Sequence, residues 1–357
     1  MPPKPNRREF WRGRRVLVTG HTGFKGAWLS LWLRGLEAEV TGYALAPPCT
    51  PNLWDIVGGG SASIIGDVRD AARVCQSLRE ADPQVIIHMA AQALVRESYR
   101  DPLGTYATNV LGTGTLLQAC RSLQALQCVV IVTSDKVYEN HGEQRPFVEA
   151  DRLGGHDPYS SSKACAELLT SSFRESYFSD GAPIATARAG NVIGGGDWSA
   201  DRLVPDCVRA LQAGEPVRLR YPDAVRPWQH VLEPLGGYLA LAEALVLAPD
   251  TAPRAVNFGP DPASFCRVHE VVDAFSARFG GKPGWERDAA VHPPEAHALA
   301  LSSGLAERAL AWRPSLGIGE SLAWTADWYR SYAAGEDMLR FSEAQISKYQ
   351  RLSGLSL

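Results

Sequence analysis

The sequence has no long hydrophobic run and no excess of charge. Its longest largely apolar stretch, residues 237–248, is interrupted by Glu243, whereas a membrane span needs about 18 or more apolar residues. The apolar run after the basic N-terminus, residues 16–18, is too short for the core of a signal peptide. A net charge of -3 argues against nucleic acid or an anionic membrane as the main partner. These absences predict a cytoplasmic protein with neither a membrane nor a nucleic-acid partner.

The seven cysteines are scattered and contain no CxxC pair. This pattern is typical of reduced thiols in a cytosolic protein and gives no spacing suited to metal ligands. We therefore expect no metal site and no catalytic cysteine.

From Arg14 onward, short β-branched runs alternate with longer helical patterns. The pattern predicts strands at 15–19, 39–44, 63–65, 84–88, 128–133 and 184–187, and helices at 25–33, 71–81, 105–123 and 160–174. Strict alternation of strand and helix implies right-handed crossovers. The expected fold is therefore α/β of the Rossmann type, a doubly wound parallel sheet.

A glycine-spaced turn follows the first predicted strand. Gly20 permits a tight turn, Gly23 lets the backbone approach a pyrophosphate, and Gly26 allows the next helix to pack closely. The N-terminus of that helix adds amide donors and the positive end of a dipole. His21 and Lys25 add positive charge beside the expected phosphates, although Lys25 fits a solvated helix position equally well. The residues expected to hold a dinucleotide here are Gly20, His21, Gly23, Phe24, Lys25 and Gly26.

Residues 1–12 read as a flexible tail, and residues 13–190 as the dinucleotide-binding Rossmann domain. After about residue 191, glycines, prolines and loop-rich stretches predominate. We expect residues 191–357 to form mainly a smaller substrate-binding domain, with segments near 226–260 returning to the sheet. Ligands of such folds bind at the carboxyl edge of the sheet.

Candidate catalytic residues follow the fifth predicted strand and begin a later helix. Tyr159 and Lys163 are four residues apart and share a helix face. A nearby ammonium stabilises the phenolate of a tyrosine, whose ordinary pKa is about 10. Ser134 directly follows the fifth predicted strand, and the ionisable pair Asp135 and Lys136 comes next.

The G-x-x-G-x-x-G spacing and the order Ser134, Tyr159, Lys163 resemble the extended short-chain dehydrogenase/reductase family. The resemblance implies NAD as the cofactor, with Asp67 and Val68 at its adenine ring, although Asp67 could equally cap the next helix. Further cofactor contacts are implied for Ala90, Ala91, Gln92, Thr133, Tyr159 and Lys163. The second strand ends without the carboxylate that would select NAD over NADP. The preference for NAD therefore rests on the resemblance.

Within this family, Asp135 and Lys136 after the serine resemble the sugar 4,6-dehydratases, and in particular the group that acts on CDP-glucose. The likeness extends over nearly the whole chain, including residues 190–198 and 226–234. Residues 188–198 and 226–231 resemble the nucleotide-sugar contacts of the family. It implies oxidation at C4 of the sugar, loss of the C6 hydroxyl with Asp135 as acid and Lys136 as base at C5, and return of hydride to C6. An ion pair of Lys136 with Asp135 or Glu139 is the alternative reading. The implied product, CDP-4-dehydro-6-deoxy-D-glucose, feeds dideoxyhexose and lipopolysaccharide synthesis.

The resemblance also implies substrate contacts and an assembly. Nucleotide-sugar contacts are expected at Asn191, Arg202 and Arg226. A homodimer would form by packing of the helices at 105–123 and 160–174, although Leu116 and Leu117 fit burial on their own sheet equally well.

Three rival functions stay open at this point. A nucleotide-sugar 4-epimerase would use Tyr159 and Lys163 without needing Asp135 and Lys136. A catalytically silent NAD-binding regulator should have lost Tyr159 or Lys163, and both are present. A dehydratase of dTDP- or GDP-linked sugars would keep the same chemistry, because the choice of cytidine rests on resemblance alone.

Overall fold

The computed structural model describes residues 6–60, 62–142, 145–281, 284–290 and 299–354. At its centre lies a sheet of seven parallel strands in the order β11-β6-β5-β4-β1-β2-β3. These strands are β1 (Arg15–Thr19), β2 (Glu39–Ala44), β3 (Ala62–Ile65), β4 (Val85–His88), β5 (Cys128–Val132), β6 (Ile184–Ala189) and β11 (Ala255–Phe258). The predicted doubly wound α/β fold is confirmed.

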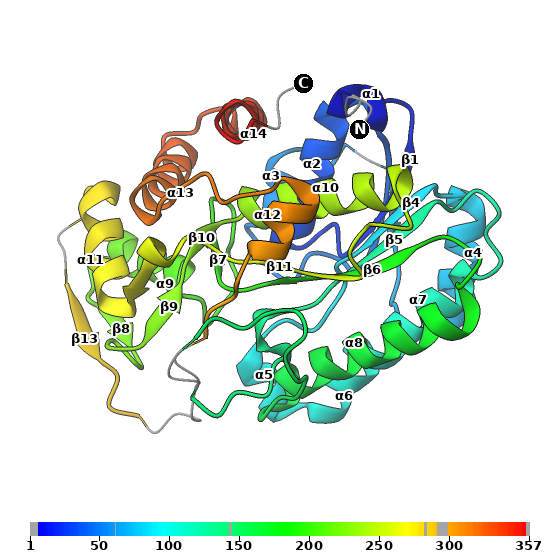
Figure 1. Ribbon diagram of the computed structural model, residues 1–357. Coiled ribbons are helices and arrows are strands. Elements are labelled where there is room, and N and C mark those ends of the chain that lie inside the picture. The colour runs from blue at the N-terminus through cyan, green and yellow to red at the C-terminus, as the bar shows by residue number, and fades with distance from the viewer. Residues whose placement is uncertain (1–5, 61, 143–144, 282–283, 291–298, 355–357) are drawn as a thin grey trace.

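Both faces of the sheet are buried, as is usual for parallel strands. In β1, Val16 and Val18 face one hydrophobic core and Leu17 the other. Helices α2 (Phe24–Gly35) and α10 (Leu232–Leu247) cover the first face, and α4 (Ala71–Ala81), α7 (Gly112–Cys120) and α8 (Pro158–Tyr177) cover the second (Figure 1). The near-continuous apolar runs of the strands therefore follow from burial on both sides.

The helix expected at 105–123 is interrupted. It consists of α6 (Pro102–Tyr106), the π-helical turn η1 (Ala107–Leu111) and α7, and a short helix α5 (Val95–Arg100) precedes it. Leu116 and Leu117 are buried against their own sheet, which was the alternative considered for them.

The chain adds successive strands on one side of β1 and then changes to its other side, although all seven strands are parallel. The chain runs from β1 to β2 and β3 on one side, and from β4 to β5 and β6 on the other. Such a switch point leaves a crevice beyond the carboxyl ends of the two central strands. Thr19 and His88, the last residues of β1 and β4, are paired in register, and Thr19 Oγ1 lies 2.7 Å from His88 Nδ1. The loops after these two strands therefore meet at this crevice.

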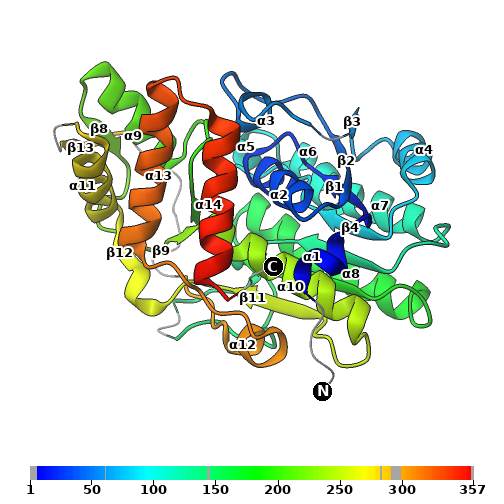
Figure 2. The same cartoon turned by 90° about the horizontal axis from the view of Figure 1, so that it is seen from above.

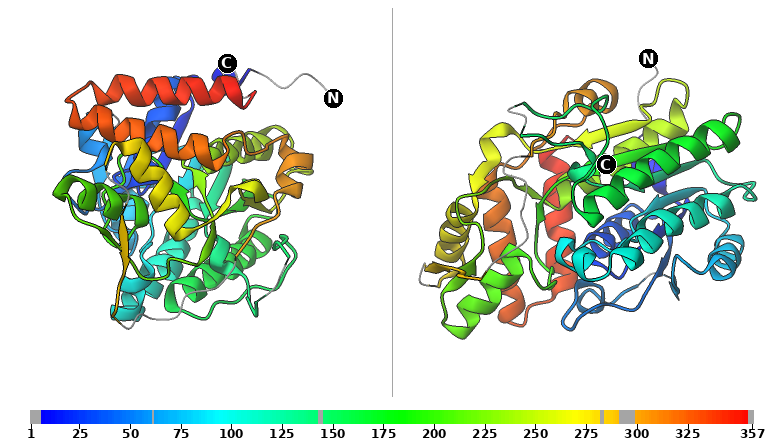
Figure 3. Two further views of the ribbon diagram at one scale, coloured as in Figure 1. Left: turned by 90° about the vertical axis from the view of Figure 1, so that its left-hand side faces the viewer. Right: turned by 90° about the horizontal axis from the view of Figure 1, so that it is seen from below.

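The second part of the chain lies beside one end of the sheet (Figures 2 and 3). Its larger helices are α9 (Leu203–Ala213), α11 (Val268–Phe279), α13 (Ile318–Ala333) and α14 (Met338–Leu352). Short strand pairs join β7 (Val192–Ile193) to β10 (Gln229–His230), β8 (Val217–Leu219) to β13 (Trp285–Arg287), and β9 (Val225–Pro227) to β12 (Phe265–Arg267). The smaller helical segments are α3 (Leu53–Ile56), η2 (Asp135–Val137), η3 (Pro262–Ser264) and α12 (Gly304–Leu310).

The prediction of a flexible tail at residues 1–12 is wrong for Arg7–Trp11, which form helix α1. Phe10 and Trp11 are buried, because they bring large apolar surfaces into the core beside α10. Arg7 Nη2 and Trp11 Nε1 donate to the carboxylate of Glu243 at 3.0 and 2.8 Å. Residues 1–5 of that predicted tail lie outside the described residues.

A second carboxylate of α10 binds the C-terminal segments. Glu233 Oε1 accepts from the backbone amides of Ser315 and Leu316 at 2.8 and 2.6 Å, and Oε2 accepts from the Tyr349 hydroxyl at 2.8 Å. Its complete burial raises the pKa of Glu233 to about 7. Helix α10 thus connects the sheet to both α1 and α14.

No helix within the described ranges is long and apolar enough to cross a membrane. The same part of the chain contains no cluster of three or more His, Cys, Asp or Glu side chains that could hold a metal ion.

Candidate active site

The glycine loop connects β1 to α2 at the crevice. Gly20 has a φ of +76°, and a Cβ there would lie 2.8 Å from the backbone nitrogen of Ala90. A Cβ on Gly26 would lie 2.1 Å from the carbonyl oxygen of Gly20. A Cβ on Gly23 would meet only that same oxygen, at 3.3 Å, so the other side of this residue is open. The loop therefore has the turn, the close helix packing and the open backbone that a pyrophosphate needs.

His21 does not carry the positive charge expected of it. Its Nε2 lies 2.7 Å from Ser63 Oγ, and its ring packs edge-on against Trp54 at 4.6 Å. A Cβ on Gly42 would lie 2.2 Å from the ring, so β2 must have glycine there. Burial lowers the pKa of His21 to about 4. The ring is therefore neutral at neutral pH.

Lys25 is not the solvated helix residue that was the alternative for it. Its Nζ donates to the hydroxyl of Tyr238 on α10 at 3.0 Å. Burial lowers the pKa of Lys25 to about 7, the charges of Arg202 and Lys163 act in the same direction, and that of Asp135 opposes them. This electrostatic coupling places the amine near the catalytic candidates.

Beside β2 and β3, where the resemblance implies the adenine ring, lie two residues that the sequence analysis did not identify. Leu45, which directly follows β2, and Ile65, the last residue of β3, have large exposed apolar side chains against which a base could pack. The Asp67 carboxylate is held by Arg69, whose Nε donates to it at 3.0 Å. The cap of α4 is Asp70, so Asp67 does not have the alternative role of capping that helix. The only signal for Leu45 and Ile65 was their position at the ends of strands. Val68 is buried in the same hydrophobic core as Leu17 of β1.

The loop after β4 lies against the glycine loop. The backbone amide of Ala90 donates to Thr19 Oγ1 at 3.1 Å, and Ala91 follows directly. The side chain of Gln92 is engaged within its own loop, where Nε2 donates to Thr105 Oγ1 at 2.9 Å and Oε1 accepts from a backbone amide. Ala90 and Ala91 thus present small residues at the crevice, and Gln92 shapes the loop.

The sequence analysis did not identify Asn109, which lies in the π-helical turn, as a site residue. Its Oδ1 accepts from the amide of Gln92 at 2.8 Å, and its Nδ2 donates to Ser162 Oγ at 2.8 Å. It therefore joins the loop after β4 to the helix that carries Tyr159 and Lys163. A polar residue within a helical run gives no local signal of such a role.

Tyr159 and Lys163 occupy the first turns of α8, as predicted. Asp157 caps the helix by accepting from the amide of Ser160 at 2.9 Å, and Pro158 occupies the first helical position. Lys163 Nζ donates to the carbonyl of Val132 at 3.2 Å, and burial lowers the pKa of this lysine to about 8.

Ser134, Asp135 and Lys136 lie on and just before η2, facing Tyr159. Ser134 Oγ donates to Asp135 Oδ1 at 3.0 Å, and Lys136 Nζ lies 3.6 Å from the same oxygen. The alternative ion pair of Lys136 with Asp135 is therefore present, whereas Glu139 pairs with Arg152 at 3.0 Å.

The environment of Tyr159 favours its protonated form in this state. Burial raises the pKa of Tyr159, whereas its hydrogen bond with Ser134 and the charges of Lys136 and Arg202 oppose that rise. Among the charges that favour the phenolate are those of Lys136 and Arg202, which the sequence analysis did not consider for this role.

A buried ion pair lies beneath these groups. Arg188 was expected within a stretch of nucleotide-sugar contacts, but its Nη2 binds Glu167 of α8 at 2.8 Å inside the core. The second oxygen of Glu167 accepts from Thr133 Oγ1 at 2.5 Å. Arg188 Nη1 also donates to the Tyr138 hydroxyl at 2.7 Å. Arg188 and Thr133 therefore support the segment that carries Ser134 to Lys136.

The three residues expected at the substrate are spread more widely. Arg202 directly precedes α9, binds Asp197 at 2.9 Å, and acts electrostatically on Tyr159. Asn191 follows β6, and its carbonyl accepts from the amide of Gln229 at 3.3 Å. Arg226 lies on β9, where its guanidinium donates to the carbonyl of Val225. The structure thus brings Arg202 to the catalytic cluster and places Asn191 at the end of the neighbouring strand.

A Rossmann-type sheet whose glycine loop faces a Ser, Tyr and Lys set defines an enzyme of the nicotinamide-dependent dehydrogenase class. Residues 16–259 match the model of the NAD dependent epimerase/dehydratase family. The chain belongs to this family, which confirms the predicted dependence on NAD.

Individual relatives agree with this family. A CDP-glucose 4,6-dehydratase of Salmonella typhimurium is 45% identical over 350 residues, which cover 96% of this chain and 98% of the relative. A dTDP-glucose 4,6-dehydratase of Xanthomonas campestris is 30% identical, covering 88% and 92% of the two chains. The solved UDP-glucose 4-epimerase of Thermus thermophilus in complex with NAD is 27% identical, with a TM-score of 0.76 over 88% of this chain and 99% of that one. The predicted resemblance to the CDP-glucose 4,6-dehydratases is confirmed.

Proposed function

We propose that the protein dehydrates CDP-D-glucose to CDP-4-dehydro-6-deoxy-D-glucose. The observation that carries the proposal is the pair Asp135 and Lys136, set directly after Ser134 and beside Tyr159. An epimerase needs no second acid and base at this position, whereas a dehydratase does. The relative with 45% identity is named for this reaction and matches nearly the whole chain.

Tyr159 and Ser134 would act at the C4 hydroxyl of the sugar. Tyr159 would take the hydroxyl proton as a phenolate, the form that the Ser134 hydrogen bond and the charges of Lys136 and Arg202 favour. Ser134 Oγ would orient the hydroxyl by a hydrogen bond. When bound, NAD would accept the hydride from C4 and later return it at C6, so that no net redox change results. The glycine loop fits its pyrophosphate, and the loop after β4 and Lys163 would hold the rest of it.

Asp135 and Lys136 would carry out the elimination. The C4 ketone acidifies the hydrogen at C5, and Lys136 Nζ removes it as a proton. The electrons of that C–H bond form a C5–C6 double bond as the C6–oxygen bond breaks. In the ion pair the proton is on Lys136 and the negative charge on Asp135, so this step requires that the proton first pass from Lys136 Nζ to Asp135. Asp135 then gives it to the departing oxygen, which leaves as water, and the proton that Lys136 took from C5 returns to C5 when hydride returns to C6. One acid and one base at the two neighbouring carbons account for both protons.

Incubation of the purified protein with NAD and a panel of CDP-, dTDP-, UDP- and GDP-glucose, followed by mass analysis, tests the proposal. Loss of water from CDP-glucose alone is the expected result. Loss of water only from another nucleotide sugar would change the assigned base. An unchanged mass with inversion at C4, detected by NMR, would instead identify an epimerase.

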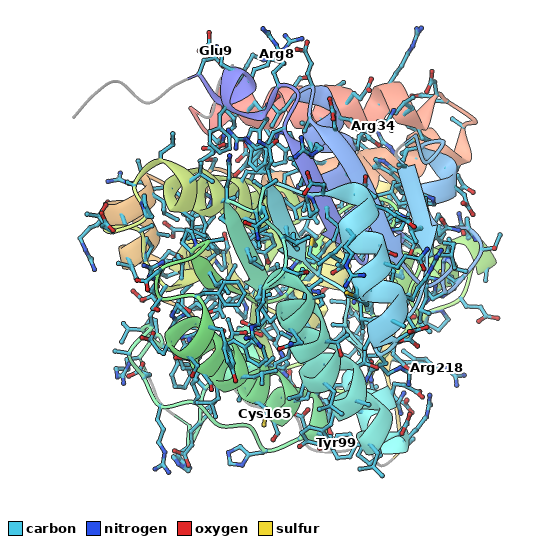
Figure 4. All side chains as sticks on the ribbon, turned by 90° about the vertical axis from the view of Figure 1, so that its right-hand side faces the viewer. Arg8, Glu9, Arg34, Tyr99, Cys165 and Arg218 are labelled. Atoms are coloured by element: carbon cyan, nitrogen blue, oxygen red, sulfur yellow. The ribbon has the colours of Figure 1, made fainter. Side chains whose placement is uncertain are left out.

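A homodimer, a cytoplasmic location and a role in lipopolysaccharide sugar synthesis belong to the same proposal. The dimer is supported by large apolar side chains exposed on helices away from the sheet: Leu103 of α6 at 81%, Leu111 of η1 at 67% and Leu168 of α8 at 59%. Figure 4 views this side of the molecule, with Cys165 of α8 labelled. Sedimentation should give a dimer for the wild type and a monomer for Leu168→Asp.

A further inference from the structure

Gly190 stands where β6 ends, between Ala189 and the predicted substrate residue Asn191. Its φ lies outside the left-handed region, so the backbone does not require glycine here. A Cβ at this position would have Asp135 as its nearest neighbour, lying 2.6 Å from Oδ2, 3.1 Å from Cγ and 3.5 Å from Cβ of that residue. The space left by the missing side chain is therefore occupied by the Asp135 carboxyl group.

The two oxygens of Asp135 have different surroundings. Oδ1 accepts from Ser134 Oγ at 3.0 Å and lies 3.6 Å from Lys136 Nζ. Among the hydrogen bonds of the described residues, Oδ2 accepts none, and it is the oxygen that lies over Gly190. The carboxyl group is buried, so the atoms packed around it fix the direction in which Oδ2 points. Oδ2 is thus the oxygen available to a bound substrate.

We propose that Gly190 is a positioning residue, whose missing side chain lets Asp135 Oδ2 face the C6 hydroxyl of the sugar. The inference rests on the proposed dehydratase function and names a residue that sets its second step. A methyl group at position 190 turns the carboxyl group away while leaving Ser134, Tyr159 and Lys163 in place. The oxidation at C4 then proceeds, and the elimination does not.

The test compares Gly190→Ala with the wild type in single turnovers with NAD and CDP-glucose. Absorbance of NADH reports oxidation at C4, and mass analysis reports the loss of water. We expect NADH to form at the wild-type rate with an unchanged KM, and loss of water to slow by about 10²-fold or more, the scale of a lost general acid. Unimpaired loss of water in this variant would overturn the proposal.

Gly35→Ala is the matched control. Gly35 ends α2, its φ is also outside the left-handed region, and a Cβ there meets nothing within 4 Å. This variant should keep both rates and the wild-type Tm. A loss in Gly190→Ala that Gly35→Ala reproduces would show a general effect of replacing glycine and would refute the assigned role.

A double-mutant cycle with Asp135→Ala separates positioning from misfolding. If Gly190 acts through the carboxyl group, Gly190→Ala lowers Tm in the wild type but not in Asp135→Ala, and it slows the loss of water no further there. An equal drop in both backgrounds contradicts the proposal, even if Gly190→Ala alone folds poorly. The comparison of Tm values needs no substrate. It therefore still tests the contact between Gly190 and the Asp135 carboxyl group if the wild type dehydrates no sugar and the proposed function fails.

Discussion

Replacing Glu167 by glutamine should destabilise the protein strongly. The side chains of Glu167 and Arg188 are only 3% and 4% exposed, and Arg188 binds both carboxylate oxygens through Nε and Nη2 at 2.9 and 2.8 Å. Glutamine keeps the shape and leaves the guanidinium charge buried without its counter-charge. Breaking a buried pair in this way costs about 3–5 kcal/mol. The free energy of unfolding in urea should fall by that amount.

The same helix offers a matched control. Glu175 of α8 pairs with Arg174 at 3.2 Å, but its side chain is 75% exposed. Glu175→Gln should change the free energy of unfolding by less than about 1 kcal/mol, because water screens such a pair. If Glu167→Gln cost no more than Glu175→Gln, the buried pair would contribute nothing, and the reasoning from burial would be refuted. Removing both charges, in Glu167→Gln with Arg188→Met, should recover part of the loss.

Three further outcomes are expected. Tyr159→Phe should abolish formation of NADH from CDP-glucose, because no group then takes the C4 hydroxyl proton; NADH formed at the wild-type rate would assign that role elsewhere. Lys136→Ala should form NADH but lose water slowly, and a full rate of water loss would move the C5 base to another group, such as a water held by Asp135. Glu233 has a pKa raised from 4.5 to about 7, so its contribution to stability is complete below pH 4.5 and is lost as the pH rises through 7. Wild-type stability should therefore fall by up to about 3 kcal/mol across this window relative to Glu233→Gln, measured by urea unfolding, since one pKa unit corresponds to about 1.4 kcal/mol; parallel pH profiles would contradict the assignment.

The central sheet could be predicted because its pattern is local. Strands β1, β2 and β3 and helix α4 lie at or within one residue of their predicted bounds. In β1, burial on both faces explains the continuous apolar run from which the strand was predicted. The interruption at Ala107–Leu111 could not be predicted, because a π-helical turn differs from an α-helix in hydrogen bonding and not in apolar spacing.

The remaining differences come from partners distant in sequence. Arg7 and Trp11 read as tail residues because their acceptor, Glu243, is more than 230 positions away. Arg188 was expected near the substrate because it lies in residues 188–198, a stretch that resembles the nucleotide-sugar contacts of the family. Its partner Glu167 is on another element, and only the fold brings them together.

The charges of His21 and Lys25 were misjudged for a related reason. Their identities suggested cations beside a phosphate, but pKa values depend on burial, which no residue type reveals. The catalytic spacing of Tyr159 and Lys163 was easier to read, because it lies within a single helix.

Helix α10 connects the N-terminal helix, the central sheet and the C-terminal segments. It lies on the central sheet and binds the N-terminal helix through Glu243 and the C-terminal segments through Glu233. The glycine- and proline-rich sequence after about residue 191 therefore does not mark a hinge. The parts of the chain before and after this residue should unfold in one cooperative transition. Rotation of one half against the other would require the buried bonds of Glu233 to Ser315, Leu316 and Tyr349 to break.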